Sequence, residues 1–478
     1  MIFEGRPYII TDKKQKKIGD PMSRGRKYVL FLVMAVILLT TGIILYVVLS
    51  KGENNPEVKV YFEKQSSRDK IIYIASDLHY LTDNLTDKKE AYEKYISTGD
   101  GKQIDDMDEI LDAFSYDIKR TNPDILIISG DLTCNGEKES HTELAKKLMA
   151  IEKSGTSVYV IPGNHDILNP WARGFKEDQQ FVTDSITPDE FSEIYRAYGY
   201  EEAISKDNTT LSYLAAPSDD IWLLMLDTNI YKDNMDKGYP VANGILGKGT
   251  LDWIEECSAM AKEKGASIIT VMHHNILNHS EVIQEGYTLD NSGQAYIRFK
   301  QNNLNLVFSG HIHVQDISSD KKDDNTLYDI ASGALSVNPH QYGVLQYSAL
   351  RDCFDYSTAK VDVEGWAKKE NKTNKNLLNF TSYSEEYFGR LAYNRAYASL
   401  SKDNTLTEDD RKVMADTMRL LNIRYFAGAE DLNTSDVINS KGYELLSSYP
   451  EGHYSNYVQS IISDQDINDL RLHIDIKR

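Results

Sequence analysis

Five short apolar runs, each ending in polar or charged residues, constrain the fold more than any other feature of this sequence. They are "KIIYIASDLHY", "PDILIISGDLT", "SVYVIPGNHD", "SIITVMHHN" and "NLNLVFSGHIH", and stretches with helical patterns separate them. Runs of this length and β-branched content are typical of buried strands in an α/β domain. Because ligands of such sheets bind beyond the carboxyl ends of the strands, we expect a site where these runs end.

The residues that end the runs have the chemistry of metal ligands. Carboxylate and amide oxygens and imidazole nitrogens bind divalent metals such as zinc, manganese and iron. Side chains two apart on an extended chain point to the same side, so Asp77 and His79 can meet at one site, as can His311 and His313. Each residue taken alone fits a turn or a surface position, but six of the eleven histidines lie in these segments. With no thiolate in the set, the pattern favours an open catalytic site over a structural zinc.

Composition restricts the partners of the chain. Its 478 residues, 41% of them hydrophobic, are enough for two or three domains. Beyond residue 51 the chain has 44 basic and 70 acidic side chains, a net charge of −26. A surface this acidic repels a nucleic-acid backbone, which argues against duplex nucleic acid as a partner. Cys134, Cys257 and Cys353 are too few for a disulfide framework and are expected to be packed thiols. The sequence carries no signal of oligomeric state.

The N-terminal part predicts a single-pass membrane anchor. Residues 28–50 contain no charge, and as a helix they would span roughly 35 Å, enough for a hydrocarbon core of about 30 Å. Residues 1–27 hold eight basic side chains, while Lys51 is the only basic residue close behind the span. The positive-inside bias therefore predicts a cytoplasmic N-terminus, with the rest of the chain outside the cytoplasm. Residues 51–69 read as a polar linker.

The C-terminal part predicts a small helical domain. We place the strand-rich domain at residues 70–366, a polar hinge at 367–381, and an all-α domain at 382–478. A Ser-x-x-Glu sequence beginning at Ser382 forms a capping box before a run with helical spacing. Thr407, followed by acidic residues, is a second expected N-cap.

The order of the motifs, Asp-x-His, Gly-Asp, Gly-Asn-His-Asp, His and Gly-His-x-His, resembles the calcineurin-like metallophosphoesterase superfamily over about residues 70–320. The resemblance implies an α/β fold in which a β-sandwich is flanked by helices. It also implies two divalent metal ions (manganese, iron or zinc) whose bridging hydroxide attacks a phosphoester. Carried over residue by residue, it implies one metal held by Asp77, His79 and His313, a second held by Asn164, His273 and His311, and Asp131 between them.

In the fourth and third motifs, neighbouring residues compete for one role or divide two roles between them. The family motif continues from its histidine to a proline, and here His274 and Asn275 follow His273. The family spacing favours His273 as the ligand and leaves His274 as a supporting or substrate-side group. The resemblance implies that His165 faces the substrate, where it hydrogen-bonds the phosphoryl group or protonates the leaving alkoxide. Asp166 would then fix the local turn or the imidazole tautomer.

The motifs differ from those of the protein phosphatases in this superfamily. Those enzymes have Gly-Asp-x-Val-Asp-Arg-Gly where this chain has "GDLTCNG", so that Cys134 and Asn135 stand in place of Asp and Arg. The chain looks more like the bacterial class III cyclic nucleotide phosphodiesterases, some of whose Gram-positive, membrane-attached members have a C-terminal helical domain. We therefore expect hydrolysis of a small-molecule phosphodiester, with 3′,5′-cyclic nucleotides as the leading substrate.

The expected location leaves two alternatives open. A domain outside the cytoplasm suits an extracellular phosphoesterase that acts on nucleotides or cell-wall phosphopolymers. A non-catalytic, metal-binding envelope protein whose helical tail recruits a partner is the alternative from another class.

Overall fold

The computed structural model describes residues 68–320, 325–430, 435–449, 453–463 and 468–476. The chain divides into two compact units, residues 1–63 and 64–478, and the described residues all belong to the second. The predicted membrane span at residues 28–50 lies outside them. None of the described helices has the length and apolar character that a membrane crossing needs.

The first of two large β-sheets has six strands in the order β15-β14-β13-β1-β2-β3. β1, β2 and β3 pair in parallel, and β13 pairs antiparallel with β1. The bounds are β1 (Lys70–Ala75), β2 (Ile125–Ile128), β3 (Ser157–Val160), β13 (Gln341–Ser348), β14 (Cys353–Lys360) and β15 (Arg471–Asp475).

The second sheet has seven strands in the order β11-β12-β10-β9-β8-β7-β6. Its centre is again parallel, because β8 pairs with β9, β9 with β10 and β10 with β12 in that sense. The bounds are β6 (Ser205–Lys206), β7 (Tyr213–Ala215), β8 (Ile221–Leu226), β9 (Ser267–Met272), β10 (Leu306–Ser309), β11 (Asp316–Ser319) and β12 (Tyr328–Ala331). A separate hairpin pairs β4 (Arg173–Lys176) with β5 (Gln179–Val182).

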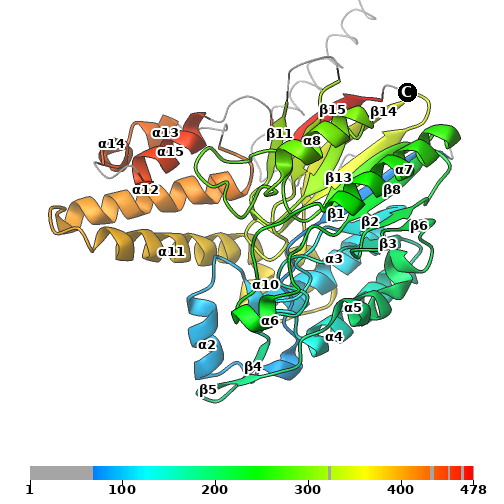
Figure 1. Ribbon diagram of the computed structural model, residues 1–478. Coiled ribbons are helices and arrows are strands. Elements are labelled where there is room, and N and C mark those ends of the chain that lie inside the picture. The colour runs from blue at the N-terminus through cyan, green and yellow to red at the C-terminus, as the bar shows by residue number, and fades with distance from the viewer. Residues whose placement is uncertain (1–67, 321–324, 431–434, 450–452, 464–467, 477–478) are drawn as a thin grey trace, which may run out of the picture. The chain divides into compact units, whose positions relative to one another are not determined.

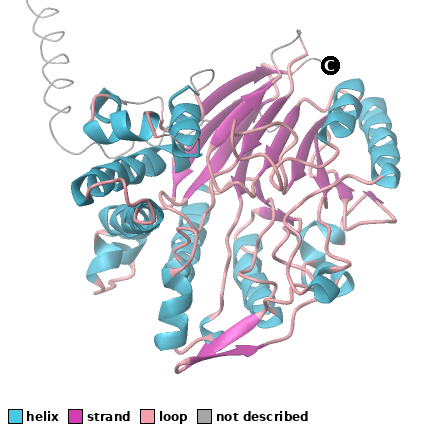
Figure 2. Ribbon diagram, turned by 60° about the vertical axis from the view of Figure 1, so that its left-hand side comes forward, coloured by secondary structure: helices cyan, strands magenta, loops and turns pink. Residues whose placement is uncertain are grey.

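Helices cover the outer faces of the two sheets (Figures 1 and 2). α3 (Met107–Thr121) and α4 (Lys138–Glu152) lie on the first sheet, and α7 (Lys248–Lys264) and α8 (Ser292–Gln301) lie on the second. Their apolar faces are buried in the core, as Phe114 and Phe299 illustrate, and burial of such a side chain contributes about 1.5–3 kcal/mol. The shorter helices are η1 (Asp83–Leu85), α2 (Glu90–Ser97), η2 (Ile104–Asp106), α5 (Pro188–Ile194), η3 (Arg196–Tyr200), α6 (Asn234–Lys237), α9 (Val363–Lys369) and α10 (Lys375–Leu378).

The inner faces of the sheets pack against each other. The rings of Phe308 in β10 and Tyr356 in β14 have centroids 5.8 Å apart, and the Tyr213 hydroxyl in β7 donates to the Val160 carbonyl at the end of β3, at 3.0 Å. The carboxyl ends of β1, β2, β3, β9 and β10 consequently meet at one edge. This arrangement confirms the predicted α/β sandwich with flanking helices, and the three cysteines are buried and free, as predicted.

The C-terminal region is helical, with one exception. Its helices are α11 (Phe380–Leu400), α12 (Glu408–Phe426), α13 (Ser435–Ile438), α14 (Lys441–Ser447) and α15 (His453–Ser463). The all-α prediction for residues 382–478 is wrong at its end, because β15 pairs antiparallel with β14 of the first sheet. The alternation in "RLHID" places Leu472 and Ile474 against the core, which is a strand pattern.

The helix starts show which capping signals decide a boundary. Thr407 is an N-cap as predicted, since its hydroxyl accepts from the Asp410 backbone N–H at 3.1 Å. The capping box predicted at Ser382 is wrong, because α11 already begins at Phe380. The segment 367–381, expected to be a polar hinge, contains the end of α9 and all of α10, with Leu377 buried.

Candidate metal centre

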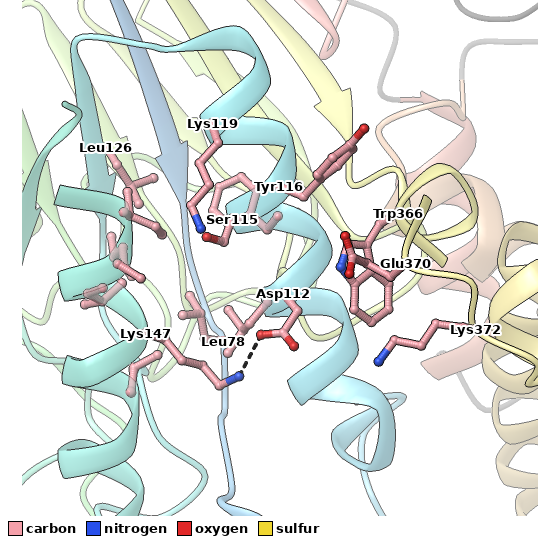
Figure 3. A pocket seen from close by; sticks show the side chains of 17 residues that line it. Leu78, Asp112, Ser115, Tyr116, Lys119, Leu126, Lys147, Trp366, Glu370 and Lys372 are labelled. Carbon is pink, nitrogen blue, oxygen red and sulfur yellow. Dashed lines mark hydrogen bonds and ion pairs between the residues drawn. The ribbon is translucent and has the colours of Figure 1, made fainter. Parts of the chain in front are cut away.

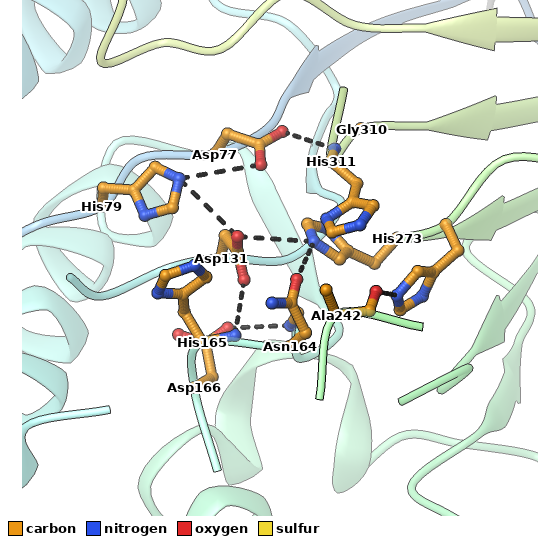
Figure 4. Close-up of polar contacts among 12 residues, drawn as sticks. Asp77, His79, Asp131, Asn164, His165, Asp166, Ala242, His273, Gly310 and His311 are labelled. Atoms are coloured by element: carbon orange, nitrogen blue, oxygen red, sulfur yellow. Dashed lines mark hydrogen bonds and ion pairs between the residues drawn. The ribbon is translucent and has the colours of Figure 1, made fainter. Parts of the chain in front are cut away.

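The loops that follow β1, β2, β3, β9 and β10 bring all the predicted ligand residues to one edge of the sandwich. Figure 4 labels each of them except His313. Several of these residues have left-handed backbone conformations, which non-glycine residues rarely adopt and which cluster at functional sites. The positive φ angles are 52° at Asp77, 44° at His79, 48° at Asp131, 69° at His311 and 63° at His313.

One group of side chains lies at the β1 side of this edge. His79 Nε2 and His313 Nε2 are 3.1 Å apart, and Asp77 Oδ1 is 3.3 Å from His313 Nε2. Asp131 Oδ2 lies 3.6 Å from His79 Nε2, and one ligand atom from each of the four residues lies within 4.8 Å of the others. Asp77 Oδ1 is buried without a hydrogen-bond partner among the described residues. Donor atoms that converge in this way fit a divalent cation.

A second group shares Asp131 with the first. Asp131 Oδ2 is 3.4 Å from His273 Nε2, and His273 Nε2 is 3.1 Å from Asn164 Oδ1. Asp131, His273 and His311 again offer ligand atoms within 4.8 Å of one another. The seven residues that the family resemblance implied as ligands thus form two adjoining groups, with Asp131 in both.

Hydrogen bonds on the far side of the imidazoles orient the rings. His273 Nδ1 donates to the Ser129 carbonyl at 2.9 Å, and His311 Nε2 donates to the Gly286 carbonyl at 2.8 Å. Such partners fix the tautomer of a ligating histidine and leave its other nitrogen for the metal. In His274 both nitrogens contact protein groups, the Thr228 hydroxyl at 2.7 Å and the Ala242 carbonyl at 2.9 Å. The geometry therefore favours His273 over His274 as the ligand.

Two glycines allow the loops to pack this closely. A Cβ at Gly163 would overlap the backbone nitrogen and carboxylate of Asp131, and a Cβ at Gly310 would overlap the Ser76 hydroxyl and the Asp77 carboxylate. Any larger residue at either position would push the ligand loops apart. The Gly-Asn-His-Asp and Gly-His-x-His motifs thus need glycine for the close approach of the loops.

The electrostatics of the groups favour bound positive charge. Burial alone would raise the pKa of Asp131, but the His273 and His165 imidazoles outweigh it and hold that pKa well below its usual range. Burial disfavours a charged His273, but the Asp131 carboxylate outweighs this effect and raises the pKa of His273 to about 9. The carboxylates therefore remain ionised and attract cations into this edge.

His165 lies beside the two groups rather than within them. Its backbone N–H donates to Asp131 Oδ1 at 2.9 Å, its ring centroid is 5.0 Å from that of His79, and Nδ1 donates to the Cys134 carbonyl at 2.8 Å. Cys134 O, and not Asp166, thus fixes its tautomer. The Asp166 carboxylate accepts backbone N–H groups of Gly163, Leu132 and Thr133, so it ties together the loops after β2 and β3.

A cavity of about 340 Å³ opens beside His165, and the sequence reasoning missed most of its lining. Its walls come from the segment around α2, from the loop after β2 and from the β4–β5 hairpin. Apart from His165 and Asn135, none of the lining side chains belongs to one of the five motifs. The lining includes Tyr95, Asp100, Lys102, Asn135, His165, Trp171 and Arg173.

A larger cavity, of about 460 Å³, lies between α3, α4 and α9 on the outer face of the first sheet (Figure 3). Apolar side chains such as Leu126 and Leu148 form its floor. At its rim Lys147 is paired with Asp112 at 2.9 Å. It contains none of the predicted site residues, so its size does not make it the site.

The fold and the two donor groups define a metal-dependent phosphoesterase. Residues 71–315, just over half of the chain, match the family described as calcineurin-like phosphoesterase. The chain therefore belongs to the calcineurin-like phosphoesterase family, whose members use a dinuclear metal centre, and the resemblance drawn from the motifs is confirmed. Residues 362–468 match a second family, described as the C-terminal domain of cyclic nucleotide phosphodiesterase.

Comparison with individual proteins gives more distant matches. Among curated proteins, none matches this chain. A dimetal phosphatase from Danio rerio is 11% identical over 60% of this chain and 95% of that chain, with a TM-score of 0.43. A protein described as GAP50, the anchor in the inner membrane complex of Plasmodium, is 13% identical over 61% of this chain and 85% of that chain, with a TM-score of 0.32.

Proposed function

We propose that this protein is a dinuclear-metal phosphodiesterase whose leading substrates are 3′,5′-cyclic nucleotides. The observation that carries the proposal is the match of residues 362–468 to the C-terminal domain of cyclic nucleotide phosphodiesterase, in the same chain as the two donor groups. The substitution of Asn135 for the arginine of the protein phosphatases points away from phosphoproteins.

The seven converging residues would hold the metals. In this assignment Asp77, His79 and His313 bind one ion, Asn164, His273 and His311 bind the other, and Asp131 contacts both. The oxygen and imidazole donors suit manganese, iron or zinc. Two such ions, when bound, acidify water and neutralise the charge that develops on the phosphoryl oxygens.

His165 is assigned to the leaving group. Because the Cys134 carbonyl accepts from Nδ1, Nε2 is the atom that exchanges a proton with the substrate. Burial lowers the pKa of His165, and an anionic phosphoester beside the ring opposes that shift. In the protonated state Nε2 can donate to the alkoxide as the ester bond breaks.

The cavity beside His165 supports a nucleotide-sized substrate. Its volume of about 340 Å³ falls within the range of small-molecule sites. Trp171, with 43% of its surface exposed, lines the cavity, and an accessible indole provides a face on which a base can stack.

The proposed location motivates a second candidate function. The basic residues 1–27 before the uncharged residues 28–50 support a single-pass anchor that leaves the enzyme outside the cytoplasm. There it would act on extracellular nucleotides or wall phosphopolymers.

The test is a substrate panel with the full-length protein purified in mild detergent. With manganese present, we expect hydrolysis of cAMP and bis-p-nitrophenyl phosphate to exceed that of p-nitrophenyl phosphate. A strong preference for the monoester would defeat the diesterase assignment. Bound metal without turnover of any diester would favour the non-catalytic alternative.

A further inference from the structure

The loop of residues 98–106, between α2 and α3, lies next to the metal centre and also forms part of the cavity wall. The Gln103 backbone N–H donates to the Ser336 carbonyl at 2.7 Å, and the Ser336 hydroxyl donates to the Asp77 carbonyl at 2.8 Å. One residue therefore separates this loop from a proposed metal ligand. Asp100, Lys102 and Ile104 of the loop line the cavity beside His165.

Helix α11 of the C-terminal region holds the same loop from its other side. The buried ring of Phe388 packs so closely on Gly101 that a Cβ there would lie 2.7 Å from it, and Gly101 has a φ of +89°. Tyrosine and arginine side chains of α11 add polar contacts at three points of the loop. These are Arg395 Nη2 to Asp100 Oδ1 at 2.5 Å, Tyr387 OH to the Lys102 carbonyl at 3.5 Å, and Tyr383 OH to Asp106 Oδ2 at 3.2 Å.

Lys102 lies near enough to Asp100 for its charge to lower the pKa of that carboxyl, but Asp100 is in direct contact with Arg395 instead. Within the described part of the chain its ammonium forms no ion pair, whereas the ammonium groups of Lys88, Lys89 and Lys147 are each paired with carboxylates. Lys102 and His165 line the same cavity. An ammonium that no carboxylate contacts directly, in the wall of the cavity that His165 lines, is a binding group for an anion.

Three other polar side chains of the cavity wall have protein partners. Asn135 Nδ2 donates to the Tyr95 hydroxyl at 3.1 Å. The Arg173 guanidinium donates to the Trp171 carbonyl at 2.6 Å and to Gln180 Oε1 at 3.3 Å. Asp100 is already paired with Arg395. Lys102 and Arg173 are the cationic groups of this wall, and Lys102 is the one on the loop that Ser336 connects to Asp77.

We propose that Lys102 binds the phosphoryl oxygens of the substrate and that α11, chiefly through Phe388, positions it, so that the C-terminal region completes the active site. This inference rests on the proposed phosphodiesterase function. It gives the helical region a role in substrate binding rather than in recruitment of a partner. Lys102 is the binding residue, and Phe388 is a positioning residue that acts through the loop.

The first experiment measures the affinity of the manganese-loaded, full-length protein for inorganic phosphate by calorimetry, together with kcat and KM on bis-p-nitrophenyl phosphate. Lys102→Met should weaken phosphate binding and lower kcat/KM by about ten- to hundred-fold, the range for a charged hydrogen bond. Metal content should not change, and Lys102→Arg should restore most of the affinity. Lys441→Met is the matched control. It removes an exposed ion pair between Lys441 of α14 and Asp410 of α12, and it should change neither phosphate affinity nor kcat/KM.

The second experiment tests the role of α11 with a double-mutant cycle. Phe388→Ala should weaken phosphate binding several-fold, but should weaken it little further in the Lys102→Met background, because both changes act through one contact. Leu446→Ala, a truncation at a buried position of α14, controls for general loss of stability in the region and should leave phosphate affinity intact. Arg395→Met provides a milder change should Phe388→Ala fold poorly.

The outcomes separate the two proposals. Unchanged phosphate affinity in Lys102→Met overturns the role of Lys102, and additive losses in the double variant overturn the role of Phe388. A wild-type protein that binds phosphate through Lys102 but hydrolyses no phosphoester would refute the proposed function and leave the binding role standing.

Discussion

The metal centre can be compared with a second group of buried imidazole and carboxylate side chains, His279 with Asp316 and Asp329. In the second group His279 lies between the two carboxylates. Its Nδ1 is hydrogen-bonded to Asp316, and its Nε2 is 3.2 Å from Asp329 Oδ2. Asp329 also accepts the Ile276 N–H and the Ser309 hydroxyl, both at 2.7 Å. Here a proton on the imidazole and neighbouring donors satisfy Asp329, while Asp316 contacts His279 and also lies close to the buried carboxylates of Glu430 and Asp469.

The metal centre differs in two respects. Its imidazole nitrogens face one another, as His79 Nε2 and His313 Nε2 do at 3.1 Å. A single proton therefore cannot provide a hydrogen bond to every acceptor atom of the group. Five of its residues have positive φ angles, whereas His279, Asp316 and Asp329 have none. Buried histidines and aspartates alone therefore do not indicate a metal site; converging donors on a strained backbone do.

The largest expected effect follows from removing the carboxylate that the two donor groups share. Asp131→Asn should lower kcat by at least about a thousand-fold and release metal, because one anionic ligand of both ions is lost. Inductively coupled plasma analysis and diester hydrolysis measure the two quantities.

Asp227→Asn is the matched control for this change. Asp227 also ends a strand and is buried, but it accepts the Leu211 and Asn229 N–H groups. It should keep full metal content. Retention of both metals and full turnover by Asp131→Asn would remove the distinction between the two groups.

The next effect separates catalysis from metal binding within the centre. His165→Gln should lower kcat by about a hundred- to ten-thousand-fold, the range for a general acid, while both metals stay bound. Loss of metal together with activity would instead make His165 part of the ligand set.

The second group should respond in stability rather than in activity. His279→Gln leaves two carboxylates buried without their cation and should lower the free energy of unfolding by about 3–5 kcal/mol, measured by urea titration. His473, exposed between Asp355 and Asp475, provides the control, since His473→Gln should cost less than about 1 kcal/mol. Equal costs at the two positions would contradict the buried ion pair.

The smallest expected effect is a pH dependence that differs in sign between the two groups. Rising pH should weaken the stabilisation of the fold by His279 and strengthen metal binding at the metal centre. Burial disfavours a charged His279, but Asp329 and Asp316 outweigh it and raise the pKa to about 10. Because the folded pKa is raised, the stabilisation is complete below about pH 6.5 and is lost as pH rises toward 10. In chelator-treated protein the stability difference between wild type and His279→Gln should therefore shrink over that window.

Metal affinity should change in the other direction, because metal ligands must lose their protons. Titration of manganese at several pH values measures it, and affinity should strengthen as pH rises from 6 to 8. A stability difference between wild type and His279→Gln that stays constant with pH would contradict these assignments. Weaker manganese binding at higher pH would contradict them as well.

Much of this molecule was predictable because its function depends on local sequence patterns. Each ligand follows an apolar strand, and parallel strands bring their ends to one edge, so Asp77, Asp131 and His311 could be grouped before their geometry was known. The choice between His273 and His274 was different, since it depends on contacts with Ser129 and Ala242 that lie far away in the sequence.

The parts that sequence reasoning missed depend on packing between distant segments. Lys102 stands in a polar loop with no motif, and its position results from the contact of Phe388 with Gly101, nearly 290 residues apart in sequence. β15 carries a short alternating pattern, but its strand partner β14 ends more than a hundred residues earlier.

The most direct test of the metal centre is an anomalous difference map from crystals of the manganese-loaded protein. We predict two peaks roughly 3.5–4 Å apart, one beside Asp77, His79 and His313, the other beside Asn164, His273 and His311, with Asp131 touching both. A single peak, or a pair of peaks that Asp131 does not bridge, would contradict the assignment.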